Sequence, residues 1–589
     1  MSELRSLVPY VRPYRRGFVV GLVCAGLANV LQIAAPYLTK LVIDGLGDPD
    51  VTRARIFGLA ALIVGAALVG GFFRWAMREL INGISRRIET DLRNDFFRHL
   101  LRLDATYYGT TRTGDLMSRA TNDTSAVRQA AGPAVMYLVN TAVTFVFALG
   151  MMLWLSPRLT LLAMIPMVAL PAIVLGFGRV IHRRYEQIQE QFAALSTFVQ
   201  ENLSGVRIVR AYTREHAELK RFDRYNEDYR QRNMGLVRTS GAFHPLLGLL
   251  SGVAMILVTG MGALEVMAGG ITLGDFVAFS MYLTMLVWPM IALGWVVNLF
   301  QRGEASMGRL NVVLRAQPAV QAPEVATPLA DVRGQVAFRG VSFRYPGTER
   351  DVLVDVSFEA GAGDMVAVVG PTGSGKSTLV ALLARLYDPT SGEITLDGIP
   401  LTRLDPADLR AHLGMVPQDS FLFSDTIEHN IGLGLTGSMD GGAAADAVTR
   451  AAKVAQLHDQ ILEFPGGYAT MLGERGINLS GGQKQRATLA RALARGPAVL
   501  ILDDGLSAVD TQTEAAILAD LRGTLRGTTS FIISHRVSAV MHADQILVLD
   551  DGRIVERGRH ADLIAADGTY ARLLRRQLLE EGLETAAVG

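Results

Sequence analysis

The sequence has a single cysteine, Cys24, in a chain of 589 residues. One cysteine excludes an internal disulfide framework and a zinc site built from cysteines. Cys24 lies in an apolar run, so we expect its thiol to be packed as a small hydrophobic group.

The sequence also lacks an excess of either charge, since 57 Lys and Arg residues face 56 Asp and Glu residues. A balanced charge gives no electrostatic reason to expect nucleic acid as a partner. The N-terminal stretch "MSELRSLVPYVRPYRRG" has no short apolar core followed by a small-residue cleavage site. We therefore expect no cleaved signal peptide.

Apolar residues are abundant instead: half of the chain is hydrophobic and the mean hydropathy is +0.27. Several apolar runs in the first half are long enough for a membrane helix, which needs about 20 residues. These runs are Gly17–Leu38, Ile56–Ala76, Gly132–Leu155, Leu159–Ile181, Ala242–Met267 and Phe276–Phe300. They predict an α-helical membrane domain with six transmembrane helices.

Arginine is concentrated in the two long segments between spans two and three and between spans four and five, for example at Arg86, Arg119, Arg207 and Arg221. The turn between spans five and six has no Lys or Arg. The positive-inside rule therefore places both long segments and both termini in the cytoplasm.

The long segments have helical spacing of apolar residues, as in "RRIETDLRNDFFRHLLRL" and "YEQIQEQFAALSTFVQENL". We expect the membrane helices to continue into the cytoplasm through them. Separate surface helices are the alternative.

The pattern changes after about residue 315. Pro and Ala are frequent and no periodicity is visible up to Gly334, which is typical of a linker. Short apolar strands then alternate with helices, as expected for an α/β domain. We predict a membrane domain over 1–315, a linker over 316–334, an α/β domain over 335–575 and a C-terminal tail over 576–589.

The stretch "VAVVGPTGSGKST" runs from Val366 to Thr378 and contains a G-x-x-x-x-G-K-[ST] pattern after an apolar strand. In a strand-loop-helix context the glycines let backbone N–H groups converge on phosphates, Lys376 supplies a positive charge and Ser377 a hydroxyl for Mg²⁺. The predicted nucleotide-binding residues are Gly370, Pro371, Thr372, Gly373, Ser374, Gly375, Lys376, Ser377 and Thr378.

A second stretch, "VLILDDGLSAVD", ends an apolar run in two adjacent acids, Asp503 and Asp504. Such runs often present a magnesium ligand at the end of a buried strand.

The stretch "LSGGQKQR", from Leu479 to Arg486, resembles the signature of the ATP-binding cassette (ABC) family, and other family motifs occur in the expected order. The resemblance implies an α/β P-loop ATPase domain that binds ATP and Mg²⁺. It implies that Tyr345 stacks on adenine and that Asp503, with Gln418 and Ser377, binds Mg²⁺. "GERG", Gly473–Gly476, is similar to the loop that precedes the signature in exporters.

The resemblance also implies roles for residues that act between two chains. In this family ATP lies between the phosphate loop of one chain and the signature of the other. The signature residues would be Leu479, Ser480, Gly481, Gly482 and Gln483, and the D-loop residues Ser507, Ala508 and Asp510. His535 would be the switch histidine, acting with Asp504 and Gln418 in hydrolysis.

The first half is similar to the membrane domain of ABC exporters, for example in "LSGVRIVRAYTREHAELKRF" and "QRGEASMGRL". The whole chain is thus identified as an exporter half-transporter that works as a dimer. Short coupling helices near Ala120–Val127 and Arg210–Glu215 would press on the ATPase domains.

Asp504 departs from the family pattern, because the residue after the magnesium-binding aspartate is usually a glutamate that orients the attacking water. A carboxylate about 1.5 Å further back would leave a site that binds ATP but hydrolyses it slowly. The alternative is that backbone adjustment lets Asp504 act normally. In combining an intact signature with a substituted acid, this chain resembles the chain that lacks the glutamate in bacterial heterodimeric multidrug exporters.

The resemblance then implies ATP-driven export of hydrophobic small molecules across the bacterial inner membrane, with a second half-transporter chain as partner. The alternatives are a lipid or lipopeptide flippase, as a homodimer, and an ATP-gated channel or regulator. In span six Met281, Met285, Trp288, Met290 and Trp295 suit apolar binding. Packing in the core or against lipid is the alternative for them.

Overall fold

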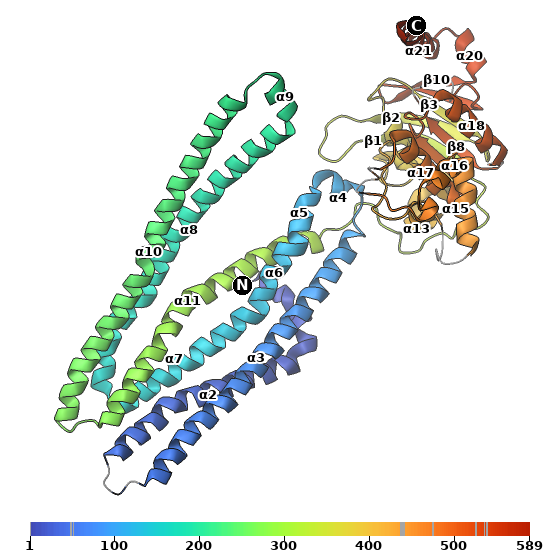
Figure 1. Cartoon of the computed structure of the whole chain (residues 1–589). Coiled ribbons are helices and arrows are strands. Elements are labelled where there is room, and N and C mark those ends of the chain that lie inside the picture. The colour runs from blue at the N-terminus through green and yellow to red at the C-terminus, as the bar shows by residue number, and fades with distance from the viewer. Residues whose placement is uncertain are drawn as a thin grey trace. The chain divides into compact units, whose positions relative to one another are not determined.

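The computed structural model describes residues 2–47, 50, 52–435, 442–473, 476, 478–524, 527–534, 536 and 540–588. The chain divides into two compact units, which Figure 1 shows as long helices and as a sheet-containing body. The first unit comprises residues 1–101 and 113–316, and the second comprises residues 102–112 and 317–589.

The described residues of the first unit form helices joined by short turns. A short N-terminal segment, η1 (Glu3–Leu7), α1 (Val8–Val11) and η2 (Arg12–Tyr14), leads into the long helices. These are α2 (Arg15–Leu46), α3 (Arg53–Leu100), α7 (Val135–Leu155), α8 (Pro157–Ser204), α10 (Glu215–Met267) and α11 (Leu273–Leu314). The shorter helices are α5 (Thr113–Ser118), η3 (Arg119–Asp123), α6 (Thr124–Gln129), η4 (Ala130–Ala134) and α9 (Val206–Ala211).

Among the described residues, six helical segments are long and apolar enough to cross a membrane. This confirms the predicted six-helix membrane domain. The 53 residues of α10 span about 80 Å at 1.5 Å per residue, well beyond a hydrocarbon core of about 30 Å. The polar parts of such helices must therefore continue into water.

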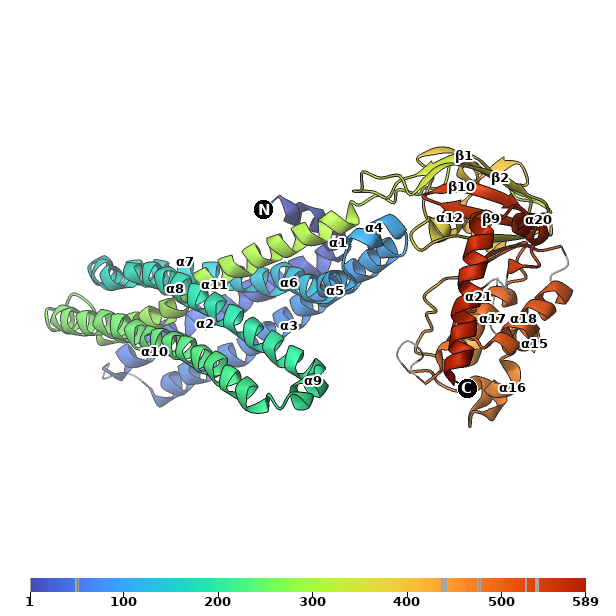
Figure 2. The ribbon, with the colours of Figure 1, turned by 90° about the horizontal axis from the view of Figure 1, so that it is seen from above.

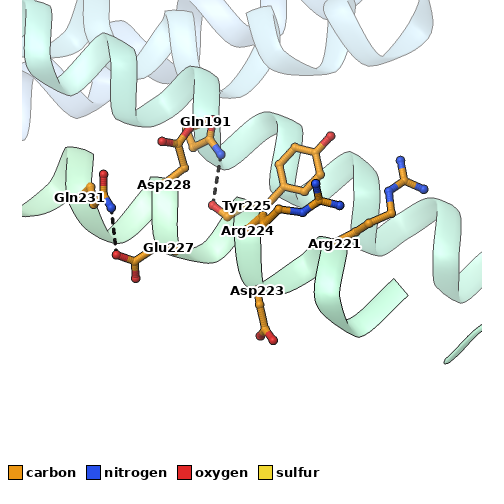
Figure 3. Close-up of a pocket in the computed structure, with 8 residues that line it drawn as sticks. All are labelled: Gln191, Arg221, Asp223, Arg224, Tyr225, Glu227, Asp228 and Gln231. Atoms are coloured by element: carbon orange, nitrogen blue, oxygen red, sulfur yellow. Dashed lines mark hydrogen bonds between the residues drawn. The ribbon is translucent and has the colours of Figure 1, made fainter. Parts of the chain in front are cut away.

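The predicted extensions are continuous with the membrane helices, because α3 runs unbroken as far as Leu100 and α8 as far as Ser204, through nearly all of the first segment singled out in the sequence and all of the second. The alternative of separate surface helices is wrong there. Helices α8 and α10 lie side by side over most of their length and are joined through α9 (Figure 2). Figure 3 shows the polar surface of this pair, where the Gln191 side chain donates to the Tyr225 carbonyl at 3.1 Å.

The predicted position of the first coupling helix is wrong. Residues Ala120–Val127 lie inside a continuous helical run from Thr113 to Leu155, and Thr124 and Val127 are buried. The Asp123 carboxylate holds them in place by pairing with Arg309 of α11. The short helix at the second predicted position is α9, which ends at Ala211 rather than running over Arg210–Glu215.

The core of the first unit lies where α2, α7, α8, α10 and α11 meet. Tyr282 is fully buried there, and its hydroxyl donates to the Ile33 carbonyl at 2.8 Å. A buried tyrosine needs such a partner. Cys24 is free and buried, which confirms that its thiol is packed.

The second unit contains two sheets. The larger has the strand order β10-β9-β3-β8-β7-β6 and is parallel apart from β10. Its strands are β3 (Met365–Val369), β6 (Leu413–Val416), β7 (Val499–Asp503), β8 (Thr529–Ile533), β9 (Gln545–Asp550) and β10 (Arg553–Gly558). The smaller antiparallel sheet contains β1 (Val336–Phe343), β2 (Leu353–Ala360), β4 (Ser391–Leu396) and β5 (Ile399–Pro400).

Apolar clusters cover both faces of the larger sheet, so every residue of β7 and β8 is buried. Burial on both faces explains why these strands are continuous apolar runs in the sequence. The helices of this unit are α4 (Ala105–Thr110), α12 (Lys376–Leu383), η5 (Leu401–Arg403), α13 (Pro406–Ala411), α14 (Ile427–Gly432), α15 (Gly442–Val454), α16 (His458–Glu463), η6 (Gly467–Ala469), α17 (Gly481–Ala494), α18 (Thr511–Thr524), α20 (His560–Ala565) and α21 (Thr569–Val588). The predicted α/β P-loop fold is confirmed.

Two observations bear on the predicted domain boundaries. Residues 315–335 contain neither helix nor strand, between the end of α11 at Leu314 and the start of β1 at Val336. Helix α21 runs from Thr569 to Val588 and so crosses from the predicted α/β domain into the predicted tail.

Candidate nucleotide-binding site

The phosphate loop joins the end of β3 to the start of α12, as its sequence pattern predicts. Helix α12 begins at Lys376, after Gly375 with a φ of 101°. The free N–H groups of its first turn and the helix dipole favour an anion at this end. The loop therefore lies at the carboxyl edge of the parallel strands, where ligands of α/β proteins bind.

Gly370 is required by space as well as by backbone conformation. A Cβ at this position would lie 2.1 Å from the Leu549 carbonyl oxygen and 2.9 Å from Ser374 Oγ. Because a backbone carbonyl in a strand cannot move aside, any larger residue would displace the loop.

Two side chains of the loop have polar groups suited to phosphate. Lys376 is buried, and its ammonium donates to the carbonyls of Gly370 at 2.9 Å and of Pro371 at 2.8 Å. Burial lowers the pKa of Lys376, while the charges of Asp503 and Asp504 act in the opposite direction. The buried Ser374 hydroxyl has no hydrogen-bond partner among the described residues. A buried polar atom left unpaired costs stability, and a bound phosphate oxygen would pair it.

Asp503 and Ser377 make a pair of oxygen donors suited to Mg²⁺. Asp503 is the last residue of β7 and is buried, and its Oδ1 accepts a hydrogen bond from Ser377 Oγ at 3.1 Å. Mg²⁺ is usually held by one or two protein oxygens together with phosphate oxygens and water. The residues present thus fit Mg²⁺ bound with a nucleotide. Gln418 is exposed in the loop that follows β6.

Asp504 follows β7 directly and adopts a left-handed backbone conformation with a φ of 50°. Its N–H donates to the Ile533 carbonyl at 2.9 Å, which fixes this turn against the end of β8. Asp tolerates this conformation better than most residues with a side chain.

Tyr345 lies beside the loop in a small aromatic group. Its hydroxyl and the Thr378 hydroxyl of α12 form a hydrogen bond of 3.0 Å. Its ring meets the edges of Phe343 and Tyr387, with centroids 4.9 and 5.3 Å apart. Burial raises the pKa of Tyr387. The contacts hold the Tyr345 ring next to the phosphate loop, where an adenine could stack.

The signature opens α17. Ser480 is the N-cap and forms a capping box with Gln483, in which each side chain bonds the other residue's N–H. Ser480 and Gly481 are exposed, whereas Leu479 is buried. Gly482 lies so close to the D-loop that a Cβ there would be 2.8 Å from the Ala508 carbonyl oxygen. The signature is therefore an exposed helix N-terminus packed on the D-loop of its own chain.

The sequence did not single out two residues that join these motifs. Gln485 is buried and donates to Ser507 Oγ at 2.9 Å, while its Oε1 accepts from the Ala508 N–H at 2.8 Å. Arg536 pairs with the buried Glu514 at 2.7 Å and donates to the Ser507 carbonyl at 3.0 Å. Gln485 lies within the stretch "LSGGQKQR" and Arg536 is the last residue of "IISHR", and this proximity to matched motif residues is the signal that could have found them.

Asp510 closes the D-loop and accepts a hydrogen bond from the Thr513 N–H at 2.9 Å. Hydrogen bonds from Thr513 lower the pKa of Asp510, so it is ionised at neutral pH. His535 lies outside the described residues, as do Glu474 and Arg475 of the loop before the signature.

Comparisons with known proteins agree with this geometry. Residues 18–290 match the family model described as "ABC transporter transmembrane region", and residues 353–507 match the model described as "ABC transporter". A probable multidrug resistance ABC transporter ATP-binding/permease protein of Bacillus subtilis is 38% identical, and the match covers 99% of each chain. A multidrug resistance-like ATP-binding protein of Escherichia coli is 37% identical, covering 100% of this chain and 98% of that protein.

A solved structure is similar over the whole chain. It is titled as the structure of a bacterial Atm1-family ABC exporter with ATP bound. The two share 29% identity with a TM-score of 0.77, and the match covers 96% of this chain and 98% of the other.

Proposed function

The chain belongs to the ABC transporter family, and from this premise we propose that it is one half of a heterodimeric exporter of hydrophobic small molecules. It unites a membrane region and an ATPase domain in one chain, and it is an ATPase coupled to transport. Relatives described as multidrug transporters over nearly their whole length support this substrate class.

We assign the domains as 1–315 for the membrane part, 316–334 for the linker, 335–575 for the ATPase and 576–589 for a tail. The multi-pass membrane part is placed in the bacterial inner membrane with both termini in the cytoplasm, because arginine is concentrated in the long segments. Cysteines introduced at Arg207 and at the exposed Ala268 test this orientation. Only the second should react with an impermeant reagent from outside, and reaction of the first would contradict it.

ATP with Mg²⁺ would be held by the phosphate loop, Tyr345, Ser377, Asp503 and Gln418. Bound Mg²⁺ would polarise the phosphates. The chain's own groups bind and orient the nucleotide: the loop N–H groups and Lys376 face the phosphates, and the aromatic ring of Tyr345 holds the base.

The observation that carries the heterodimer is the combination of Asp504 with an intact signature. Asp504 has a shorter reach than the usual glutamate by about one C–C bond of 1.5 Å. Its position is fixed by the hydrogen bond to Ile533, so the backbone cannot easily advance the carboxylate. This chain's own ATP site would then hydrolyse slowly. Its signature, capped and exposed, would complete the faster site of a partner that has the glutamate.

In α11 the side chains of Trp288 and Trp295 are exposed, and the Trp295 ring packs on Tyr137 with centroids 4.7 Å apart. Exposed aromatic groups on a membrane helix support an apolar substrate surface. Met290 is buried and belongs to the helical core, as the packing alternative expected.

A lipid flippase is the second candidate. An ATP-dependent lipid A-core flippase of Aromatoleum aromaticum is 35% identical and is covered over 96% of its length. If this chain were a flippase, two copies of it would form the transporter as a homodimer.

The experiment is affinity purification of the tagged chain from its native host in detergent and nanodiscs. We expect a second, different half-transporter at one-to-one ratio, with a glutamate after its magnesium-binding aspartate. We also expect brisk ATPase activity from the pair and slow activity from this chain alone. A homodimer that hydrolyses ATP briskly would contradict the heterodimer, and ATP-dependent translocation of fluorescent lipid in its liposomes would favour the flippase.

A further inference from the structure

Arg385 stands out because it is a large, charged residue in a strained and buried place. Arg385 comes directly after Ala384, the C-cap of α12. The φ of Arg385 is 45°, and only 3% of its surface is exposed. Left-handed backbone is unfavourable for a long side chain, so the surroundings must hold it there. Strain of this kind is concentrated at functional sites.

The guanidinium of Arg385 uses each of its nitrogens for a different partner. Nε pairs with Asp388 at 2.9 Å, Nη1 donates to the Leu404 carbonyl at 2.8 Å and Nη2 donates to the Gln321 carbonyl at 3.0 Å. Arg410 in turn donates to the Arg385 carbonyl at 2.6 Å. A lysine has no planar fork and could not make these three contacts together.

The contact with Gln321 reaches the segment between the membrane part and the ATPase. The neighbouring residue, Val320, donates its N–H to Asp104 Oδ2 at 2.8 Å. The other oxygen of Asp104 caps α4 by accepting from the Tyr107 N–H at 3.2 Å. One carboxylate therefore joins the chain that has just left α3 to the chain that has just left α11.

The ends of these two long helices are also joined to each other. His99 Nε2, in the last turn of α3, lies 3.0 Å from the Ala316 carbonyl oxygen, just beyond α11. Only a few residues separate each of these positions from Asp104 and Val320. A displacement of either helix end is thus passed on through short, hydrogen-bonded stretches of chain.

At its other side Arg385 is close to the nucleotide. Tyr387, two residues on, packs against Tyr345, which bonds Thr378 in the first turns of α12. The end of α12 and the aromatic wall of the proposed ATP site are therefore fixed by the same short segment.

We propose that Arg385 is a positioning residue that links nucleotide occupancy at Tyr345 and α12 to the ends of α3 and α11 of the same chain. The link runs through Gln321, Val320 and Asp104, and it does not pass through the partner chain. This inference rests on the proposed ATP site and adds how nucleotide binding at that site is transmitted to the membrane helices.

The test is hydrogen–deuterium exchange of the assembled dimer in nanodiscs, with and without saturating ATP, Mg²⁺ and vanadate. In the wild type, nucleotide should slow exchange of the peptide containing Val320 by about fivefold, the effect of strengthening one hydrogen bond. Asp104→Asn keeps an oxygen to cap α4 but turns an amide group toward the Val320 N–H. It should remove most of that slowing, and so should Arg385→Lys.

Binding of trinitrophenyl-ATP, measured in parallel, separates linkage from damage to the site, and its Kd should stay within about threefold of wild type in both variants. Asp405 caps α13 in the same way, by accepting from the Ala407 N–H at 2.7 Å, so Asp405→Asn is the matched control and should behave as wild type. Normal trinitrophenyl-ATP binding with no slowing in the wild type, or with full slowing in Asp104→Asn, overturns the link and leaves the ATP site standing. Absence of trinitrophenyl-ATP binding by the wild type overturns both.

Discussion

Lengthening Asp504 by one methylene should restore hydrolysis at this chain's own ATP site. The carboxylate of Asp504→Glu would reach about 1.5 Å further. Because a misplacement of about 1 Å can cost 10²-fold in rate, we expect a gain of up to about 10²-fold, or about 2.7 kcal/mol of activation free energy. The φ of 50° at this position strains a glutamate more than an aspartate, by about 1 kcal/mol. That strain is present in the ground state and in the transition state alike, so it lowers the melting temperature and not the rate.

The assay must isolate the proposed slow site from the proposed fast site of the partner. Ser480→Arg in this chain places a bulky side chain on the signature that faces the partner's ATP, and it should nearly abolish hydrolysis at the fast site. In that background we expect Asp504→Glu to raise the residual ATPase activity of the purified pair, and Asp504→Asn to leave it low. Thermal unfolding of the Ser480→Arg variant measures the stability lost with the Ser480 N-cap, which we expect to be about 1 kcal/mol.

Two results would refute this reasoning. One is a Ser480→Arg/Asp504→Glu double variant whose ATPase rate is no higher than that of Ser480→Arg alone. The reach of the Asp504 carboxylate would then not limit hydrolysis at the proposed slow site. The other is an otherwise unchanged pair in which Asp504→Asn destroys hydrolysis, which would make Asp504 a competent catalytic residue.

Two further predictions concern the same site. Gln418→Ala should leave ATP binding nearly unchanged, because the phosphate loop, Ser377 and Asp503 would still hold the phosphates and Mg²⁺. It should reduce transport more than hydrolysis in proteoliposomes, and a loss of binding in proportion to transport would contradict its coupling role. Burial lowers the pKa of Lys376, so its ammonium loses its proton at a lower pH than a free lysine does. ATP affinity should therefore fall as the pH is raised toward that lowered pKa, and Lys376→Arg, which stays charged, should bind ATP with little pH dependence over the same range; an equal fall in both proteins would exclude Lys376 as the cause.

The parts of the fold that were predictable are those encoded within a short stretch of sequence. Apolar runs longer than 20 residues predict membrane helices, and a phosphate loop is a local strand-loop-helix pattern. The Arg385 cluster was not predictable, because its contacts join residues 64 apart, at Gln321, and extend to Asp104, 216 residues before Val320. No periodicity signals such pairs.

The misplaced coupling helix has the same cause. The resemblance to exporters implied a separate short helix near Ala120–Val127. The burial of these residues depends on the Asp123–Arg309 pair, which joins positions 186 apart, and on the close packing of Gly303 against Ala130. Tertiary contacts thus keep the helix continuous where the resemblance implied a separate short helix.

The intact signature has a structural role of its own in a chain whose own ATP site we propose to be slow. Gln485 joins the first turns of α17 to Ser507 and Ala508, so the signature and the turn after Asp504 form one hydrogen-bonded block. Gln485→Leu has a similar volume but removes the hydrogen bonds to the Ser507 hydroxyl and the Ala508 N–H, each worth about 0.5–1.5 kcal/mol. We expect it to lower both the melting temperature and the ATPase activity of the pair, because in the proposed heterodimer the shifted signature would serve the partner's fast site.

Gln456→Leu is the matched control. The Gln456 side chain is exposed and donates to Asp520 at 2.6 Å, away from the D-loop, so its loss should change neither quantity. Gln485→Glu keeps the acceptor for the Ala508 N–H and should fall between the two. If Gln485→Leu behaves like the control, the signature is held independently of the D-loop, and its retention in this chain has to be explained by the partner's ATP alone.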